Sequence, residues 1–325
     1  GLRVCKAFKR LLMKFIDVTL RDGGHQHGFN WPLEFVERYL ESINSFQEVE
    51  FVELGYWKQS GKFDGPFYSI EEKLLSSICQ MTKKNLSIMV DYHYCSHNVE
   101  DFPNSIDFPE LGLIRVCLRK EDISEGCRFV KELKKYTSCK LSINFFNITN
   151  YEESDLAFAC ETSKESKADF MYFADTHGGL DLGKNLEMFK RFTKLIKKIG
   201  MIPGLHLHDH SGKAYFNYRN LLSAGFDATD VSLGGLGKGL GNLRLEHVFD
   251  LRGREHILDH LIIDQGLFHM PSGPYGVLTA RDSITDHYAV EAERKGLTPS
   301  QFVTRLERIS GSSKDNYKSE ILSDE

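Results

Sequence analysis

Eight short apolar segments recur along the chain at intervals of roughly 30 residues, the size of one strand–helix unit. Each is rich in β-branched or other apolar residues, as buried strands are, and they cover 15–20, 49–54, 86–92, 112–118, 140–146, 169–174, 202–207 and 229–233. Amphipathic stretches of helical period lie between most of them, at 33–46, 70–84, 123–136, 152–166, 185–199 and 215–224. Eight alternating units in about 230 residues predict an α/β fold, a closed (β/α)8 TIM barrel rather than an open sheet.

The pattern also predicts how the chain is divided. No linker rich in Pro or Gly interrupts residues 13–250, which we expect to form one catalytic domain. Residues 1–12 are basic and precede Met13, so they are interpreted as an N-terminal extension or a tag remnant. Residues 251–325 are expected to be a helical C-terminal extension with helices at 254–264, 284–294 and 299–309, a break at 273–276 and a frayed polar tail from 310.

Composition narrows the class of protein. The 325 residues are 41% hydrophobic and carry a net charge of −5, which is ordinary for a globular enzyme and gives no basic stripe for nucleic acid. No apolar run approaches the ~20 residues that span a bilayer. Seven cysteines without a C-x-x-C pair are typical of reduced thiols, so we expect a cytoplasmic protein with no membrane partner.

Two polar motifs at strand ends predict a metal site. Asp22 follows the first strand, and His206 and His208 end the seventh. Alternating strand positions point to one side, so the two imidazoles share a face. Barrel closure places strands 7, 8 and 1 side by side, with their C-terminal ends at one rim. Such nitrogen and oxygen ligands suit Mg²⁺, Mn²⁺, Zn²⁺ or Fe²⁺.

Other interpretations exist for these residues. Asp22 could simply form a turn before Gly23, and the two histidines could be buried strand residues, but their shared rim favours ligands. Asn242 could be a further ligand or the N-cap of a following helix, with equal weight. The glycine-rich loop 234–241 does not have phosphate-loop spacing, so we expect it to pack its backbone closely over the metal site.

The ordered motifs resemble those of a known family. Asp-Val-Thr-Leu-Arg-Asp-Gly at 17–23, His-Leu-His-Asp at 206–209 and Gly-Gly-Leu-Gly-Lys-Gly-Leu-Gly-Asn at 234–242 resemble signatures of the DRE-TIM metallolyases, the HMG-CoA-lyase-like family. Matching segments at 52–55 and 175–178 extend the resemblance over residues 15–250. The family includes isopropylmalate, homocitrate and citramalate synthases, HMG-CoA lyase and 4-hydroxy-2-oxovalerate aldolase.

The resemblance implies a role for each site residue. It implies a divalent metal, Mn²⁺ or Mg²⁺ before Zn²⁺ or Co²⁺, held by Asp22, His206, His208 and Asn242. Arg21 would stabilise the enolate oxygen, because a guanidinium is permanently charged. Thr176 would bind the carboxylate of a 2-oxo acid, and Glu53 fills the Glu position of the family name as a catalytic residue.

His25 distinguishes the branches of the family. It lies three residues after Asp22, where it resembles the base of 4-hydroxy-2-oxovalerate aldolases, and histidine suits proton transfer. Tyr275, in Gly-Pro-Tyr-Gly-Val, resembles their substrate-facing tyrosine. The strand-8 loop lacks the cysteine of HMG-CoA lyase. We therefore expect a metal-dependent aldolase, a carbon–carbon lyase that acts on a 4-hydroxy-2-oxo acid through a pyruvate-type enolate.

Two other functions remain open. The same metal and Arg21 would serve a Claisen-type synthase that joins an acyl-CoA to a 2-oxo acid. Alternatively, the chain could be a partner-docking subunit of an aldolase–dehydrogenase-like complex, with the C-terminal helices binding a dehydrogenase or a second copy in a homo-oligomer.

Overall fold

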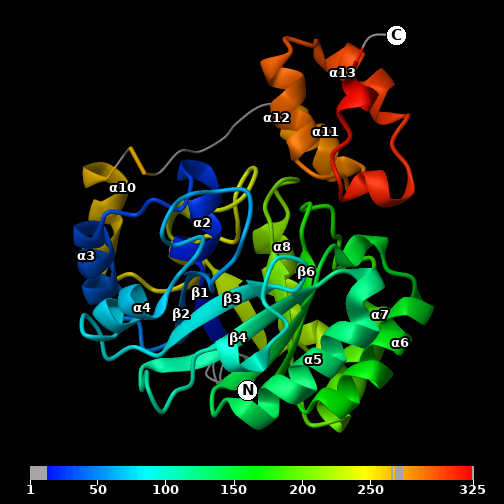
Figure 1. Ribbon diagram of the computed structural model, residues 1–325. Helices are drawn as coiled ribbons and strands as arrows, with labels where there is room; N and C mark the ends of the chain where they lie inside the picture. The colour runs from blue at the N-terminus through cyan, green and yellow to red at the C-terminus, as the bar shows by residue number, and fades with distance from the viewer. Residues whose placement is uncertain (1–12, 265, 268–273, 324–325) are drawn as a thin grey trace, which may run out of the picture.

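Eight parallel strands close into a barrel in the computed structural model, which describes residues 13–264, 266–267 and 274–323 (Figure 1). The first strand pairs with the last through Lys14 and Ala228, so the sheet has no free edge. This confirms the predicted TIM barrel. The strands are β1 (Lys14–Asp17), β2 (Val49–Tyr56), β3 (Leu86–Asp91), β4 (Leu111–Leu118), β5 (Lys140–Phe145), β6 (Phe170–Asp175), β7 (Ile202–Leu207) and β8 (Ala228–Val231). The predicted extension 1–12 lies outside the described residues.

Helices cover the outside of the sheet and bury their apolar faces against it. The main ones are α3 (Leu33–Ile43), α4 (Glu72–Cys79), α5 (Ile123–Tyr136), α6 (Glu153–Ser163), α7 (Leu186–Lys198) and α8 (Ala214–Ala224). The large core lies between these helices and the strands. The predicted limits of β7 and α5 are confirmed, and the other predicted limits differ from the observed ones by a few residues.

The interior of the barrel changes from apolar to charged along the strands. Phe51 and Leu113 belong to a small apolar cluster inside the barrel. Two residues further along the same strands come Glu53 and Arg115, both fully buried. Residues two apart point to the same side of a strand, so the apolar plug is followed by a charged layer towards the C-terminal ends.

The segment after β1 is a helix, not the predicted end of a strand followed by a turn. α2 (Thr19–His27) begins two residues after β1 and ends at Gly28, whose φ of 75° is left-handed. The Asp17 carboxylate accepts hydrogen bonds from the Thr19 backbone N–H at 3.2 Å and the Thr19 hydroxyl at 3.0 Å, which turns the chain into the helix. Arg21, Asp22 and His25 therefore lie on one short helix.

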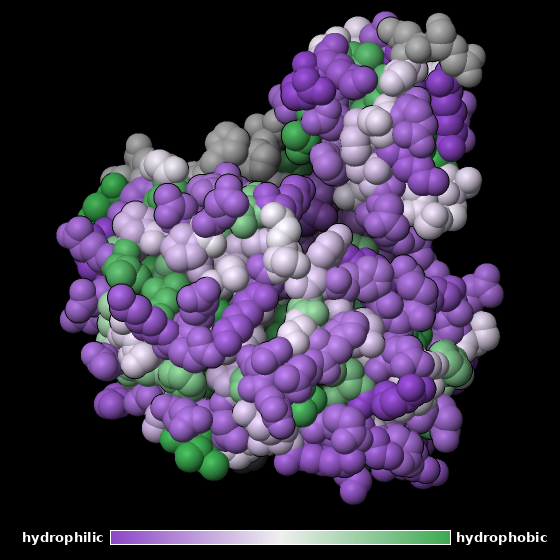
Figure 2. Space-filling view, viewed as in Figure 1, coloured by the Kyte–Doolittle hydropathy of each residue, from purple (hydrophilic) through white to green (hydrophobic). Residues whose placement is uncertain are grey.

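The C-terminal unit, residues 274–323, packs its own core at one end of the barrel (Figures 1 and 2). It contains α11 (Pro274–Arg281), α12 (His287–Arg294) and α13 (Pro299–Leu306). The predicted break at 273–276 is wrong from Pro274 on, because Pro is well placed in a first helical turn. The predicted fraying is wrong for residues 310–323, where Leu322 is buried in this core.

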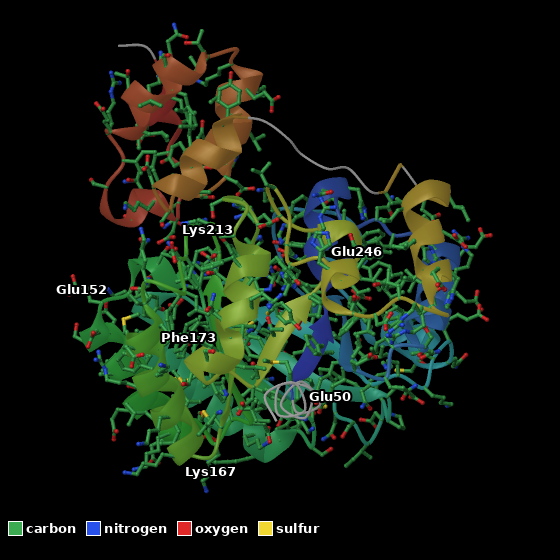
Figure 3. All side chains as sticks on the ribbon, turned by 180° about the vertical axis from the view of Figure 1, so that it is seen from behind. Glu50, Glu152, Lys167, Phe173, Lys213 and Glu246 are labelled. Atoms are coloured by element: carbon green, nitrogen blue, oxygen red, sulfur yellow. The ribbon has the colours of Figure 1, made fainter. Side chains whose placement is uncertain are left out.

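Residues before the unit pack on the barrel instead. α9 (Leu245–Val248) follows β8, and α10 (Asp259–Ile263) lies beside α3, where Arg38 pairs with Asp264 at 2.7 Å. Figure 3 places Lys213 at the end of the barrel that faces the C-terminal unit and Glu50 at the opposite end. Within the described part of the chain, no helix has the length and apolar character needed to cross a membrane.

Candidate metal centre

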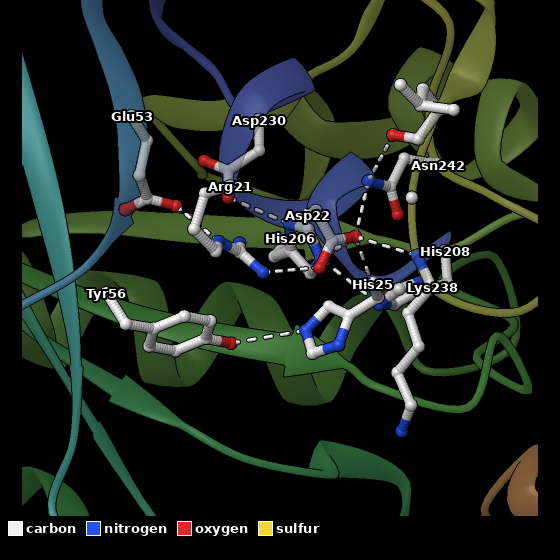
Figure 4. Close-up of polar contacts among 12 residues, drawn as sticks. Arg21, Asp22, His25, Glu53, Tyr56, His206, His208, Asp230, Lys238 and Asn242 are labelled. Carbon is white, nitrogen blue, oxygen red and sulfur yellow. Dashed lines mark hydrogen bonds and ion pairs between the residues drawn. The ribbon is translucent and has the colours of Figure 1, made fainter. Parts of the chain in front are cut away.

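The barrel brings Asp22, His206 and His208 together at its C-terminal rim (Figure 4). One ligand atom from each lies within 4.8 Å of the others. The two Nε2 atoms are 3.2 Å apart, and each lies 3.9 Å from Asp22 Oδ2. Two imidazole nitrogens that each lie about 2.0–2.1 Å from one ion have a similar separation, so the geometry fits shared coordination.

The hydrogen bonds around the cluster leave some nitrogen and oxygen lone pairs free to bind an ion. His206 Nδ1 lies 2.8 Å from Asp230 Oδ2. A carboxylate only accepts, so Nδ1 carries the proton and the Nε2 lone pair faces His208. Asn242 Oδ1 is buried and has no partner among the described residues, while its amide nitrogen donates to Asp22 Oδ2 at 2.6 Å. This donor set fits a divalent cation.

Asn242 does not cap a helix. α9 begins three residues later, and its N-cap is Arg244. The unpartnered Asn242 oxygen beside Asp22 instead supports the alternative that Asn242 is a ligand. The cap interpretation is wrong because residues 241–243 bond to the end of β7: Asp209 N–H donates to Gly241 O and Leu243 N–H to Leu207 O.

The glycine loop packs over this centre as expected. A Cβ on Gly237 would lie 2.7 Å from Asp22 Oδ2 and would also clash with the Asn242 amide. A Cβ on Gly23 would lie 2.5 Å from Leu236 Cδ2. Glycine at these positions allows the loop and α2 to approach each other closely.

A chain of buried ion pairs joins two of the proposed ligands from beneath. Arg21 pairs with Asp22 and, through Nε, with Glu53 Oε1 at 2.7 Å. Glu53 also pairs with Arg115 at 3.2 Å, and Arg115 pairs with Asp230 at 2.8 Å, which contacts His206. Burial opposes ionisation of Asp22, but Arg21 and the imidazoles outweigh it and hold the pKa of Asp22 well below its usual range. The guanidinium of Arg21 is thus fixed beside the centre.

His25 lies beside the ligands without joining them. Its Nε2 is 3.3 Å from the Tyr56 hydroxyl, and its ring packs edge-on against Phe29 and Phe63. Burial lowers the pKa of His25 to about 3, so the imidazole is neutral and can accept a proton.

The structure does not bring every predicted site residue to this cluster. Glu53 lies beneath it and holds two arginines. Thr176 follows β6 at the rim, where its hydroxyl accepts from the Asn147 backbone N–H at 2.8 Å. Tyr275 donates its hydroxyl to Leu297 O and packs on Phe302 inside the C-terminal unit. The predicted substrate-facing role of Tyr275 finds no support in this placement.

Sequence reasoning did not single out Asp230, Lys238 or Asp286. Asp230 could have been found, because it lies two residues after Ala228 on β8, at an inward-facing position of the barrel. Lys238 pairs with Asp286 of the C-terminal unit at 3.0 Å. No local pattern connects these two residues, which are far apart in sequence.

A TIM barrel with an Asp-His-His cluster at its C-terminal rim defines the class: a barrel whose rim carries a ligand set that fits a divalent cation. Residues 117–260 match the family model described as HMGL-like. These residues thus carry an HMGL-like domain, in agreement with the resemblance of the motifs to the DRE-TIM metallolyases.

Two known proteins are similar to about three quarters of this chain. The chain is 24% identical over 244 residues to a probable 2-isopropylmalate synthase of Archaeoglobus fulgidus, covering 73% of this chain and 46% of that protein. It is 22% identical over 246 residues to oxaloacetate decarboxylase of Mycobacterium tuberculosis, covering 74% and 70%. The chain spans about half the length of the first curated synthases it matches.

One solved structure shares the fold over nearly its whole length. It is the N-terminal domain of a Bacteroides vulgatus protein with a provisional aldolase name. The TM-score is 0.72 at 19% identity, and the match covers 86% of this chain and 96% of that one.

Proposed function

We propose that this chain is a divalent-metal-dependent enzyme that forms an enolate from a 2-oxo acid. The observation that carries the proposal is the buried Arg21, which Glu53 fixes beside Asp22. A fixed, permanently charged donor stabilises negative charge on an oxygen as it develops. Asp22, His206, His208 and Asn242 would hold the ion, which supplies Lewis acidity towards the carbonyl of the substrate.

Within this class we favour an aldolase that cleaves a 4-hydroxy-2-oxo acid. A neutral imidazole beside the ligand cluster is placed to accept the proton of a 4-hydroxyl group. His25 has this character, and Tyr56 at 3.3 Å fixes its orientation. Thr176 at the rim would position the carboxylate of the substrate.

A Claisen-type synthase is the second candidate. The similarity to a protein named as a 2-isopropylmalate synthase favours it. In that reaction Arg21 would stabilise the same enolate oxygen, and an acyl thioester would take part in carbon–carbon bond formation. His25 is the feature that ranks the aldolase first.

Two assays on the same metal-reconstituted protein separate these candidates. The first measures pyruvate release from a panel of 4-hydroxy-2-oxo acids, and the second measures thiol release from acetyl-CoA with a panel of 2-oxo acids. We expect pyruvate release that a chelator abolishes and Mn²⁺ or Mg²⁺ restores. Thiol release alone would select the synthase, and a chelator-insensitive activity would contradict both.

Binding of a dehydrogenase or of a second copy of the chain is proposed only as a property of the C-terminal unit. Size-exclusion chromatography with light scattering reports whether the isolated chain self-associates. A monomer with full turnover would contradict the need for a dehydrogenase partner or a second copy.

A further inference from the structure

Lys238 is held at the rim directly beside the metal centre. Its backbone N–H lies 3.4 Å from Asp22 Oδ2, and its carbonyl accepts from His210 Nε2 at 2.9 Å. Figure 4 shows the side chain leaving the ligand cluster on the side where His25 lies. The main chain of Lys238 is thus held at two points at the C-terminal rim, here called the mouth of the barrel.

The partner of this ammonium comes from the C-terminal unit. Asp286, the residue before α12, lies 3.0 Å from Lys238 Nζ, and the two side chains are 13% and 26% exposed. Asp286 is therefore the counter-ion that the structure shows for Lys238.

A second lysine makes the mouth more positive. Lys62, in the exposed loop after β2, interacts electrostatically with both Lys238 and Asp286. Among the residues that the structure describes, Lys62 forms no ion pair, and its ammonium lies over the Phe63 ring at 5.5 Å. Lys238 pairs with Asp286 and Lys62 lies within its electrostatic range, beside the site where the 2-oxo acid is proposed to bind.

We propose that Lys238 binds a second carboxylate of the substrate, at the end remote from the 2-oxo acid. This carboxylate would replace Asp286 as the partner of the ammonium, and Lys62 would stabilise the released Asp286. Because the substrate carboxylate would take the place of the Asp286 carboxylate, the site suits a group with a single negative charge better than a phosphate dianion. The inference rests on the proposed function and specifies its substrate class as dicarboxylic 2-oxo acids.

Two probes of equal chain length test this inference by calorimetric binding to Mn²⁺-loaded protein. 2-Oxoglutarate has the distal carboxylate, and 2-oxovalerate lacks it. We expect 2-oxoglutarate to bind at least tenfold more tightly, since a charge-assisted hydrogen bond contributes about 10- to 100-fold in affinity. Lys238→Met should remove this preference and leave 2-oxovalerate binding unchanged.

Two further variants sharpen the test. Lys213→Met is the matched control, because Lys213 pairs with Asp181 at 3.1 Å outside the mouth and should leave both affinities unchanged. Asp286→Asn removes the competing carboxylate and should tighten 2-oxoglutarate binding several-fold. Thermal unfolding with Mn²⁺ confirms that each variant is folded.

The outcomes separate this inference from the proposed function. Equal binding of both probes, unchanged by Lys238→Met, would overturn the role of Lys238 and leave the 2-oxo acid function in place. Loss of 2-oxoglutarate binding in Asp286→Asn would overturn the exchange of carboxylates. Failure of both probes to bind Mn²⁺-loaded wild-type protein would overturn both proposals.

Discussion

Asp230 Oδ2 lies 2.8 Å from His206 Nδ1 and accepts a second hydrogen bond from Arg115 at 2.8 Å. Burial opposes ionisation of Asp230, but Arg115 and His206 outweigh it and lower its pKa. The carboxylate therefore sets the tautomer and orientation of a proposed metal ligand without touching the ion.

Asp230→Asn should weaken divalent-metal affinity by about 10- to 100-fold, the usual effect of removing a group that orients a ligand. Competition with a chromophoric chelator measures this affinity. Asp227→Asn is the control, since the side chain of Asp227 pairs with Lys197 at the surface. Equal affinity in both variants would show that His206 is oriented by other contacts.

His25→Ala should slow aldol cleavage by about 10²- to 10⁴-fold, because a general base is lost. It should keep its metal, whereas Asp22→Ala should lose both metal and activity. Bound metal and rate are measured on the same preparations, with exposed His256→Ala as the control. Near-normal cleavage by His25→Ala would move the synthase ahead, and loss of metal would make His25 a ligand.

Gly237→Ala should displace the metal ligands with little effect on the rest of the barrel. The new methyl group would lie 2.7 Å from Asp22 Oδ2, so Asp22 or the loop must move. We expect reduced metal occupancy by elemental analysis. Gly266→Ala is the control, because no atom of the described residues lies within 4 Å of its added Cβ. Full occupancy in Gly237→Ala would mean that the loop moves away freely.

Two glutamates on β2 should differ strongly in their effect on stability. Glu53→Gln leaves two buried arginines without their shared carboxylate, and such a loss costs about 3–5 kcal/mol. Glu50→Gln removes surface pairs with Lys14 and Lys140, which contribute up to about 1 kcal/mol each. Urea unfolding measures both variants, and equal losses would contradict the buried network.

Asp17 should make stability depend on pH. Burial raises its pKa from 3.8 to about 7, so the folded state binds the proton more tightly than the unfolded state does. The stability contributed by protonated Asp17 is present below pH 4 and is lost as pH rises to about 7. Asp17→Asn should therefore gain stability relative to wild type between pH 4.5 and 8. A difference that stays constant with pH would contradict this linkage.

The barrel was predictable because its signal is repeated. Each strand and helix has its own apolar period, and eight repeats compensate for errors at individual ends. The segment after β1 was missed because Gly23 and Gly24 disfavour helix in isolation. Glycine is nevertheless required at both positions of the helix. A Cβ on Gly23 would clash with Leu236, which is distant in sequence, and a Cβ on Gly24 would clash with Phe29 just after the helix.

His206 and His208 were predictable because they stand at the end of β7, and Asp22 because it follows β1 closely. Barrel closure fixes which strands are neighbours. Asp286 and Asp315 were not predictable, since they reach the mouth through the packing of a separate unit. Asp315 contacts Asn147 and lies 3.0 Å from His177. The periodic pattern of apolar residues predicts single helices and strands, but it does not predict how the C-terminal unit packs against the barrel.

The buried ion-pair chain has a consequence for charge balance. Its three carboxylates, Asp22, Glu53 and Asp230, face only two guanidinium groups, those of Arg21 and Arg115. One negative charge is left over inside the barrel, and a divalent cation would invert it to a single positive charge. The carboxylate beside the carbonyl of a 2-oxo acid carries one negative charge, and Lys238 would neutralise a distal one. The interior would therefore become neutral only with both ion and substrate in place.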